Sequence, residues 1–238
     1  MTSSPAPTRP SARVTRAGRA HAVDLSPQRI VQVALALVAD EGLAALSTRK
    51  LAARLGCEAM SIYHHFPNKH HLLDALVDHA IASIELPDPA APPLKRLRLM
   101  LMSYREMAKR FAALYPLIAV HRLNTPTGAR LIESVLELLA AVLPDAESTA
   151  RHFRTLGYYI TGAALDETAG YARGPSAAVP VDDAYIAAHC PRLTVCAPYF
   201  QPQHWQATYE LGLEALLARV EADGAAVAAV RVRRTPRS

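Results

Sequence analysis

The sequence contains little cysteine and no long apolar run. Only Cys57, Cys190 and Cys196 occur among the 238 residues, so the thiols cannot pair into a complete set of disulfides. No apolar segment approaches the roughly 18 residues that cross a bilayer, and no hydrophobic region follows the N-terminal arginines. We therefore expect a cytoplasmic protein with no membrane partner.

Motifs of the common enzyme classes are also absent. The sequence has no glycine-rich phosphate loop, no nucleophile elbow and no clustered pair of acids beside a base. We predict neither an enzyme nor a bound cofactor. The alternative, an enzyme domain carried on a DNA-binding domain, would use His121 and Asp166 as an acid–base pair.

Strict alternation of β-branched residues is missing too, whereas apolar residues recur at the spacing of a helix along almost the whole chain. With 51% hydrophobic residues the chain can bury one large core and a smaller one. The predicted fold class is therefore all-α, with two helical domains, the second larger than the first.

Positive charge is concentrated at the two ends. The net charge is +5, but the arginines of 1–24 and 227–238 together outweigh it, so the body between them is slightly acidic. We expect 1–24 to be a disordered basic arm and 227–238 a basic tail. The arm either enters a minor groove beside the main DNA contact or is simply solvated.

Local signals place the first domain at 25–84. Ser26 before Pro27 marks a helix start, Ser47 and Asn68 are further N-caps, and Gly56 supplies the positive φ of a tight turn. The predicted helices cover roughly 27–41, 47–55, 59–65 and 69–84. Two short helices joined by a glycine turn, the second with a small and polar outer face, indicate a helix-turn-helix.

The same region resembles the tetracycline repressor (TetR) family of bacterial transcriptional regulators. The resemblance rests on Asp40-Glu41-Gly42, on Leu46-Ser47-Thr48-Arg49-Lys50-Leu51-Ala52-Ala53-Arg54-Leu55-Gly56, and on Ile62-Tyr63-His64-His65-Phe66-Pro67-Asn68-Lys69. A motif this long is more specific than a generic helix-turn-helix pattern. It implies a DNA-reading domain in 25–84 and a ligand-binding, dimerising domain in 94–226.

The motif assigns the DNA contacts. Arg49 is expected to read a base, because a guanidinium can bond guanine O6 and N7 together. Ala59, Met60 and Ser61 form the tip of the reading helix, and the first two depart from the family pattern, so the operator sequence should differ. The expected phosphate contacts are Thr48, Tyr63, His65 and Lys69.

Other charged and polar residues receive simpler interpretations. Lys50 and Arg54 are expected to be solvated helix charges. The histidine pairs 64–65 and 70–71, and the group of His189, Cys190 and Cys196, are weak metal-binding hypotheses beside the interpretation as surface residues.

The second domain follows a proline-rich linker at 87–93. Further helices are predicted near 94–112, 115–122, 127–143, 146–172, 182–189 and 203–223, with a proline-containing segment at 191–202 between the last two. The resemblance implies that 146–172 and 203–223 pair with their symmetry mates in a homodimer. An intramolecular core is the alternative.

The resemblance to the tetracycline repressors continues into this domain. Val120-His121 followed by Pro126 resembles the segment with a magnesium-ligating histidine, and Gly162 to Asp166 resembles a segment ending near the same metal. Glu85 and Ser103 stand where those repressors hold the drug with histidine and asparagine. Tetracycline is therefore one candidate effector among many. A metal is expected only as part of a chelated ligand on His121. The predicted effector-binding residues are His121, Asp166, Ser103, Met107 and Tyr158, with apolar walls from Met100, Met102, Phe111, Tyr115, Leu139 and Phe153.

The prediction is a homodimeric regulator, most simply a repressor, that leaves double-stranded operator DNA when a small-molecule effector moves the helix at 69–84. An activator or a protein-regulated DNA binder of the same fold is the alternative. A purely architectural DNA-binding protein would show neither sequence preference nor effector response.

Overall fold

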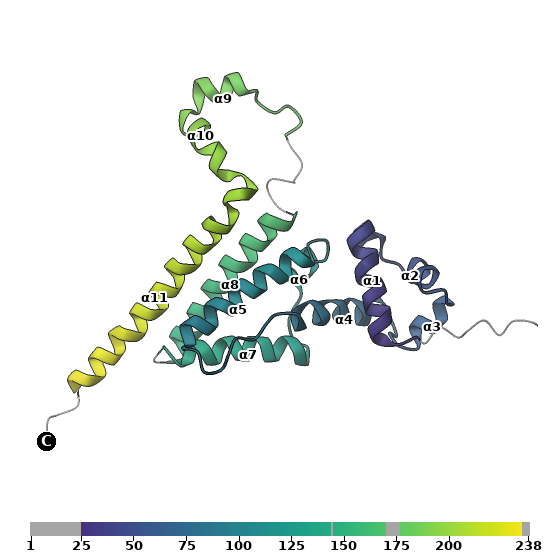
Figure 1. Cartoon of the computed structure of the whole chain (residues 1–238), viewed down its shortest axis with the longest axis horizontal. Helices are drawn as coiled ribbons and strands as arrows, with labels where there is room; N and C mark the ends of the chain where they lie inside the picture. Colours follow the sequence, from purple (N-terminus) through teal and green to yellow (C-terminus); the bar gives the residue numbers. More distant parts are fainter. Residues whose placement is uncertain (1–24, 144, 170–176, 235–238) are drawn as a thin grey trace, which may run out of the picture.

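The computed structural model describes residues 25–143, 145–169 and 177–234, with side chains as far as 226. These residues form helices and no strand, which confirms the all-α prediction (Figure 1). The expected arm at 1–24 lies outside the described residues. No helix in the described part of the chain is long and apolar enough to cross a bilayer.

The N-terminal unit is a small bundle of short helices. Its elements are α1 Pro27–Glu41, the 3-10 turn η1 Leu43–Ala45, α2 Thr48–Leu55, α3 Ala59–Tyr63 and α4 Lys69–Ala82. The three predicted N-caps are confirmed, since Ser26, Ser47 and Asn68 each accept a hydrogen bond from the backbone N–H three residues on.

Gly56 makes the turn between α2 and α3. Its φ of 67° and ψ of 32° lie in the left-handed region, where a side chain would be strained. The N–H of Cys57 then bonds the carbonyl of Ala52, which closes the end of α2. This turn sets the angle at which α3 leaves α2.

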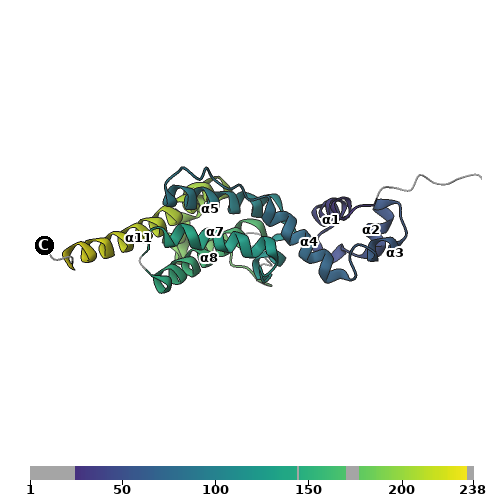
Figure 2. The same cartoon turned by 90° about the horizontal axis from the view of Figure 1, so that it is seen from below.

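The larger unit contains the remaining helices. They are α5 Pro93–Arg110, α6 Tyr115–Val120, α7 Pro126–Ala140, α8 Ala146–Ala169, α9 Asp183–His189, α10 Pro191–Cys196, the 3-10 turns η3 Ala197–Phe200 and η4 Pro202–His204, and α11 Trp205–Arg234. Figure 2 shows the two units side by side along the long axis, with α4 running from one into the other. The segment with α9 and α10 projects away from the helices of the body (Figure 1).

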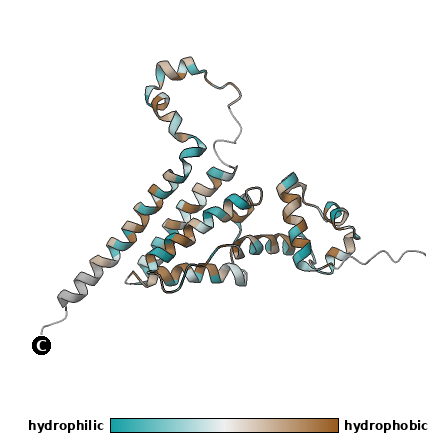
Figure 3. Ribbon diagram, in the orientation of Figure 1, coloured by the Kyte–Doolittle hydropathy of each residue, from teal (hydrophilic) through white to brown (hydrophobic). Residues whose placement is uncertain are grey.

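Two apolar cores hold the molecule together. One joins the N-terminal unit to α6 and includes Ile30, Leu76, Tyr115 and Ile118, and the other packs α5, α7, α8 and α11 around Leu213. Apolar and polar residues share each helix, as the amphipathic pattern predicted (Figure 3). Because α4 belongs to the first core, the N-terminal unit packs directly on α6.

The C-terminal third departs from the sequence prediction in two places. The segment at 191–202 is not an irregular linker, because Pro191 and Pro202 sit at first helical positions, where proline loses no hydrogen bond. The last helix does not end at 223 but runs to Arg234 through most of the expected tail. Gly224 is tolerated within it and lies where an added Cβ would come within 2.6 Å of the Val142 carbonyl oxygen.

Helices α8 and α11 approach each other closely at a glycine of α11. The small residues Gly157 and Gly162 on α8 face open space within this chain. Gly212 on α11 is the residue that permits contact, because a Cβ there would lie 2.3 Å from the hydroxyl of Tyr159. That hydroxyl donates to the carbonyl of Tyr209 at 2.6 Å.

Candidate DNA-binding surface and effector pocket

Helix α3 presents a small exposed face beside a buried anchor. Ile62 is buried in the N-terminal core, while the Met60 side chain is 64% exposed and Tyr63 is 39% exposed. Ala59 packs partly against the core and Ser61 is half-buried. At the tip of α3, Met60 is therefore the most exposed side chain, and Ser61 is less exposed.

The start of α2 lies against the end of α3. The hydroxyls of Thr48 and Tyr63 are 3.4 Å apart, and either one can donate. Arg49 is the next residue on α2 and is exposed. The structure thus brings the predicted contacts Thr48, Arg49 and Tyr63 together at one edge of the unit, a geometry suited to a groove and its flanking phosphates.

Lys50 and Arg54 are exposed, as expected, and both also form ion pairs. Lys50 Nζ lies 2.6 Å from Glu41, and Arg54 bonds both Asp40 and Glu41 at 2.7 Å. The hydrogen bond from Lys50, and then that from Arg54, lowers the pKa of Glu41. These pairs join α2 to the end of α1.

Arg49 and Lys69 differ from those two cations, since neither forms an ion pair within the described residues. Lys69 is the first residue of α4, directly after the N-cap Asn68. The side-chain oxygen of Asn68 also contacts the ring of His71 at 2.9 Å, and His65 is half-buried nearby in the chain.

The described residues contain no cluster of three or more histidines, cysteines or acids suited to a metal.

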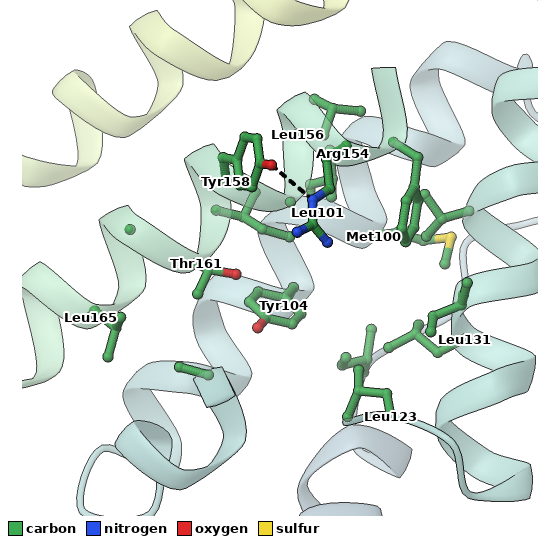
Figure 4. A pocket seen from close by; sticks show the side chains of 18 residues that line it. Met100, Leu101, Tyr104, Leu123, Leu131, Arg154, Leu156, Tyr158, Thr161 and Leu165 are labelled. Carbon is green, nitrogen blue, oxygen red and sulfur yellow. Dashed lines mark hydrogen bonds between the residues drawn. The ribbon is translucent and has the colours of Figure 1, made fainter. Parts of the chain in front are cut away.

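A cavity of about 540 Å³ lies in the larger unit between α5, α7 and α8. That volume suits a drug-sized ligand. The walls are mostly apolar and come from Met100, Leu101, Leu131, Val135, Phe153 and Leu165 among others (Figure 4). Ala119 and Leu123, on either side of the end of α6, close the side nearest α4.

Hydroxyl groups form the polar floor of this pocket. Tyr104 and Thr161 line it, and the hydroxyls of Tyr104 and Tyr115 are 3.0 Å apart. Burial raises the pKa of both tyrosines, and a hydrogen bond with Thr161 partly opposes this. Both phenols are therefore protonated at neutral pH, and Tyr104, which lines the cavity, can donate to a ligand.

Arg154 lies at the rim of the same pocket. Its Nε donates to the hydroxyl of Tyr158 at 2.9 Å, and its guanidinium carbon is 4.9 Å from the centre of that ring. Figure 4 shows the two terminal nitrogens pointing toward the space above Tyr104 and Thr161. The sequence analysis missed Arg154, Tyr104 and Thr161. The spacing of Arg154, Tyr158 and Thr161 along one helix face was the signal that could have found them.

The predicted effector-binding residues are not brought together. Tyr158 lines the pocket, as do Met100 and Phe153 from the predicted apolar wall. Ser103 instead accepts a hydrogen bond from the Glu85 N–H at 2.8 Å, at a separate surface hollow. Met107, Tyr115 and Leu139 are buried in the cores, and Asp166 is exposed on α8.

His121 faces α4 rather than the pocket. Its Nε2 donates to Asp74 at 2.9 Å, and its Nδ1 is buried without a hydrogen-bond partner in the described structure. Four residues on, Thr125 donates to Asp78 at 2.5 Å and caps α7. Two carboxylates of α4 therefore hold the segment 121–125, which begins at the wall of the pocket.

These donors do not fit a metal-chelated ligand. His121 is committed to Asp74, and the polar side chains described around the pocket are hydroxyls and a guanidinium, which are poor ligands for a hard divalent ion. We derive no step through a metal.

A buried ion pair fixes the helices behind the pocket. Arg105 on α5 bonds Glu167 on α8 at 2.8 Å, with both side chains almost fully buried. Its guanidinium also bonds Gln206 and stacks over Tyr209, both on α11. This cluster joins three helices, and the sequence pattern gave no sign of it because its members are far apart in the chain.

Comparison with known families shows to which family this chain belongs. The model described as bacterial regulatory proteins of the tetR family matches residues 30–76, and the tetracycline repressor-like C-terminal domain matches 89–223. The chain belongs to the TetR family. This confirms the resemblance predicted from both halves of the sequence.

TetR relatives align along most of the chain. The class A tetracycline repressor of transposon 1721 from Escherichia coli is 28% identical over 81% of this chain and 89% of its own length. The repressor DrrR1 of Streptomyces coeruleorubidus is 30% identical over 60% of this chain and 54% of its own length. The crystal structure of ActR from Streptomyces coelicolor with actinorhodin is 28% identical, covers 84% of this chain and 96% of its own, and superposes with a TM-score of 0.67.

Proposed function

We propose that this chain is a homodimeric TetR-family repressor that releases double-stranded operator DNA when a small molecule enters the pocket beside α7 and α8. The observation that supports this most strongly is that the wall of the pocket is connected directly to α4. The segment that closes the pocket, Ala119 to Leu123, contains the histidine that bonds α4, and α4 carries the DNA-binding unit.

The DNA contacts are proposed for the edge where α2 meets α3. Arg49 reads a base edge, with Ala59, Met60 and Ser61 at the tip of α3. Thr48, Tyr63, His65 and Lys69 bind phosphates and fix the register. The pairs that tie Lys50 and Arg54 to α1 hold this edge at a defined angle.

Dimerisation is proposed through α8 and α11. The outer face of α11 exposes Leu211 together with Ala215, Ala218 and Ala222, and Leu211 is 74% exposed in the single chain. These positions follow the spacing of one helix face, and small residues let a second helix approach closely. A twofold dimer places two reading helices on two half-sites.

Release of DNA is proposed to follow from the contacts that link the pocket to α4. A ligand that displaces Ala119 and Leu123 moves the attached 121–125 segment, and Asp74 and Asp78 carry that motion to α4. The two reading helices then no longer match the half-site spacing. Ligand and operator each weaken the binding of the other by the same factor.

Relatives suggest the size class of the effector. Class A and class C relatives are named as tetracycline repressors, and the ActR structure holds actinorhodin. The cavity of this chain, at about 540 Å³ with aromatic and aliphatic walls, suits a multi-ring organic molecule. The direct roles of His121, Asp166, Ser103 and Met107 stay predictions, whereas Tyr158 has pocket geometry in its favour.

We further propose that the protein acts in the cytoplasm, where its DNA lies, and that it catalyses no reaction. The described polar side chains around the pocket are hydroxyls and one guanidinium, which supply no general base at neutral pH.

Selection from random duplexes tests the function. The full-length chain is expected to enrich a twofold-symmetric sequence, and a panel of multi-ring compounds is then tested for release of that duplex. Equal binding to all duplexes would indicate an architectural protein instead. Tighter operator binding in the presence of ligand would indicate that the ligand strengthens DNA binding instead of releasing the DNA.

A further inference from the structure

The charge around the pocket is unbalanced. Arg154 is the one charged residue among the 18 that line the cavity, and no carboxylate is among them. Bringing an anion from water into an apolar site is costly unless a partner of opposite charge is present. The described pocket supplies that partner for an anion and supplies none for a cation.

Arg154 is held in place, and its charge has no ion-pair partner in the part of the chain that the structure describes. Tyr158 binds Nε and lies under the guanidinium, so the side chain is positioned without neutralisation. Within the described residues Arg154 forms no ion pair, whereas Arg151, one turn earlier on α8, pairs with Glu147 at 2.6 Å. The two terminal nitrogens of Arg154 point over the cavity (Figure 4), where they can bind two carboxylate oxygens together.

The rest of the pocket defines what accompanies the anion. The walls near Met100, Leu131 and Phe153 are apolar, and the phenol of Tyr104 and the hydroxyl of Thr161 lie across from Arg154 (Figure 4). A ligand that fills this space needs a flat apolar body, an oxygen that meets the hydroxyls, and a negative group at the rim.

We propose that the effector is a multi-ring aromatic carboxylate and that Arg154 is the residue that selects its charge. This inference rests on the proposed ligand-released function and adds the chemical class of the ligand. Tyr158 acts as a positioning residue, since it fixes the guanidinium that meets the anion.

The test uses the full-length protein and two probes of nearly equal size, anthraquinone-2-carboxylate and anthraquinone-2-carboxamide. Binding is measured by titration calorimetry for the unmodified chain, for Arg154→Gln and for the matched control Arg151→Gln. The carboxylate is expected to bind the unmodified chain about tenfold more tightly than the carboxamide, which corresponds to about 1.4 kcal/mol. Arg154→Gln should remove this preference and Arg151→Gln should keep it.

Three results would overturn the proposal. They are equal binding of the two probes, a preference for the carboxylate that survives in Arg154→Gln, and failure of both probes to bind. Operator binding is measured on the same samples. A chain that selects its operator but fails with these probes would leave the regulator assignment standing and refute only the ligand class.

Discussion

At the scale of single residues, cations with similar sequence contexts have different roles. Arg49, Lys50 and Arg54 all lie on α2, yet ion pairs to α1 occupy Lys50 and Arg54 and leave Arg49 available for DNA. Arg49→Ala should therefore reduce the discrimination between operator and scrambled DNA by about 1–3 kcal/mol. Fluorescence anisotropy with both duplexes measures this, and an equal loss on both would exclude base reading.

The Glu41 contacts predict a pH dependence of stability. The pKa of Glu41 is lowered in the folded state, so its contribution is present above the pKa in the unfolded chain, about 4.3, and is lost as the pH falls through the folded value. Glu41→Gln should be less stable than the unmodified chain at pH 7, and this difference should shrink as the pH is lowered to about 3.

Denaturant titrations at both pH values test this prediction. Glu58→Gln is the control, because Glu58 forms no ion pair within the described residues. A stability deficit of Glu41→Gln that persists unchanged at low pH would contradict the assigned ion pairs.

The proximity of the residues at the proposed DNA surface could be predicted from sequence because the motif is local. Thr48, Arg49 and Tyr63 lie within 16 consecutive positions and meet through a single glycine turn. Arg154 and Tyr104 could not be found in this way, because α5 and α8 approach each other only in the folded chain. The partners of Lys50 and Arg54 were missed for the same reason, since sequence spacing does not reveal which face of α1 they meet.

At the scale of helices, the proposed mechanism depends on the contacts of His121 and Thr125 with α4. Asp74→Ala removes the acceptor of the His121 ring N–H. We expect ligand still to bind, while the ratio of operator dissociation constants with and without ligand falls by about fivefold or more. Asp74→Asn keeps an acceptor and should retain most of the response. An unchanged ratio in Asp74→Ala would remove this contact from the coupling.

The contact between α8 and α11 predicts an effect on stability. An added Cβ at Gly212 would lie 2.3 Å from the Tyr159 hydroxyl, whose ring is held by its bond to Tyr209. This clash outweighs the roughly 1 kcal/mol that alanine gains over glycine in a helix. Gly212→Ala should therefore destabilise the fold by about 1–3 kcal/mol.

Thermal unfolding at a fixed protein concentration measures this change. Gly157→Ala is the matched control, because a Cβ at Gly157 meets nothing within 4 Å and should leave stability unchanged or raised. A stabilised Gly212→Ala protein would contradict the close packing of α8 and α11.

The helix ends show what sequence can predict at this scale. Caps such as Ser26, Ser47 and Asn68 depend on a bond to a residue three positions away and were predicted correctly. The helix at 191–196 was missed because the prolines of 191–202 were interpreted as a break, and the extension of α11 beyond 223 was missed as well. Pro191 at a first helical position is compatible with a helix, and so is Gly224 beside Val142.

At the scale of the whole molecule, one core runs from the reading helices to the edge of the pocket. Ile62, Leu76 and Ile118 belong to the same buried cluster, so the DNA-binding unit does not move independently of α6. In a dimer, a small rotation of α4 in each subunit changes the distance between two reading helices. In the proposed mechanism, the fold therefore converts the occupation of the cavity into a mismatch with DNA.

The most direct test of this account blocks the cavity without touching the DNA surface. Gly157 lines the pocket and faces open space, so Gly157→Leu should fill part of the cavity and leave the fold intact. Operator affinity is measured by fluorescence anisotropy with and without a releasing compound. We expect the variant to bind operator normally and to resist release, with Gly157→Ala still responsive. Release of operator from Gly157→Leu at the same compound concentration as from the unmodified chain would show that this cavity is not the effector site.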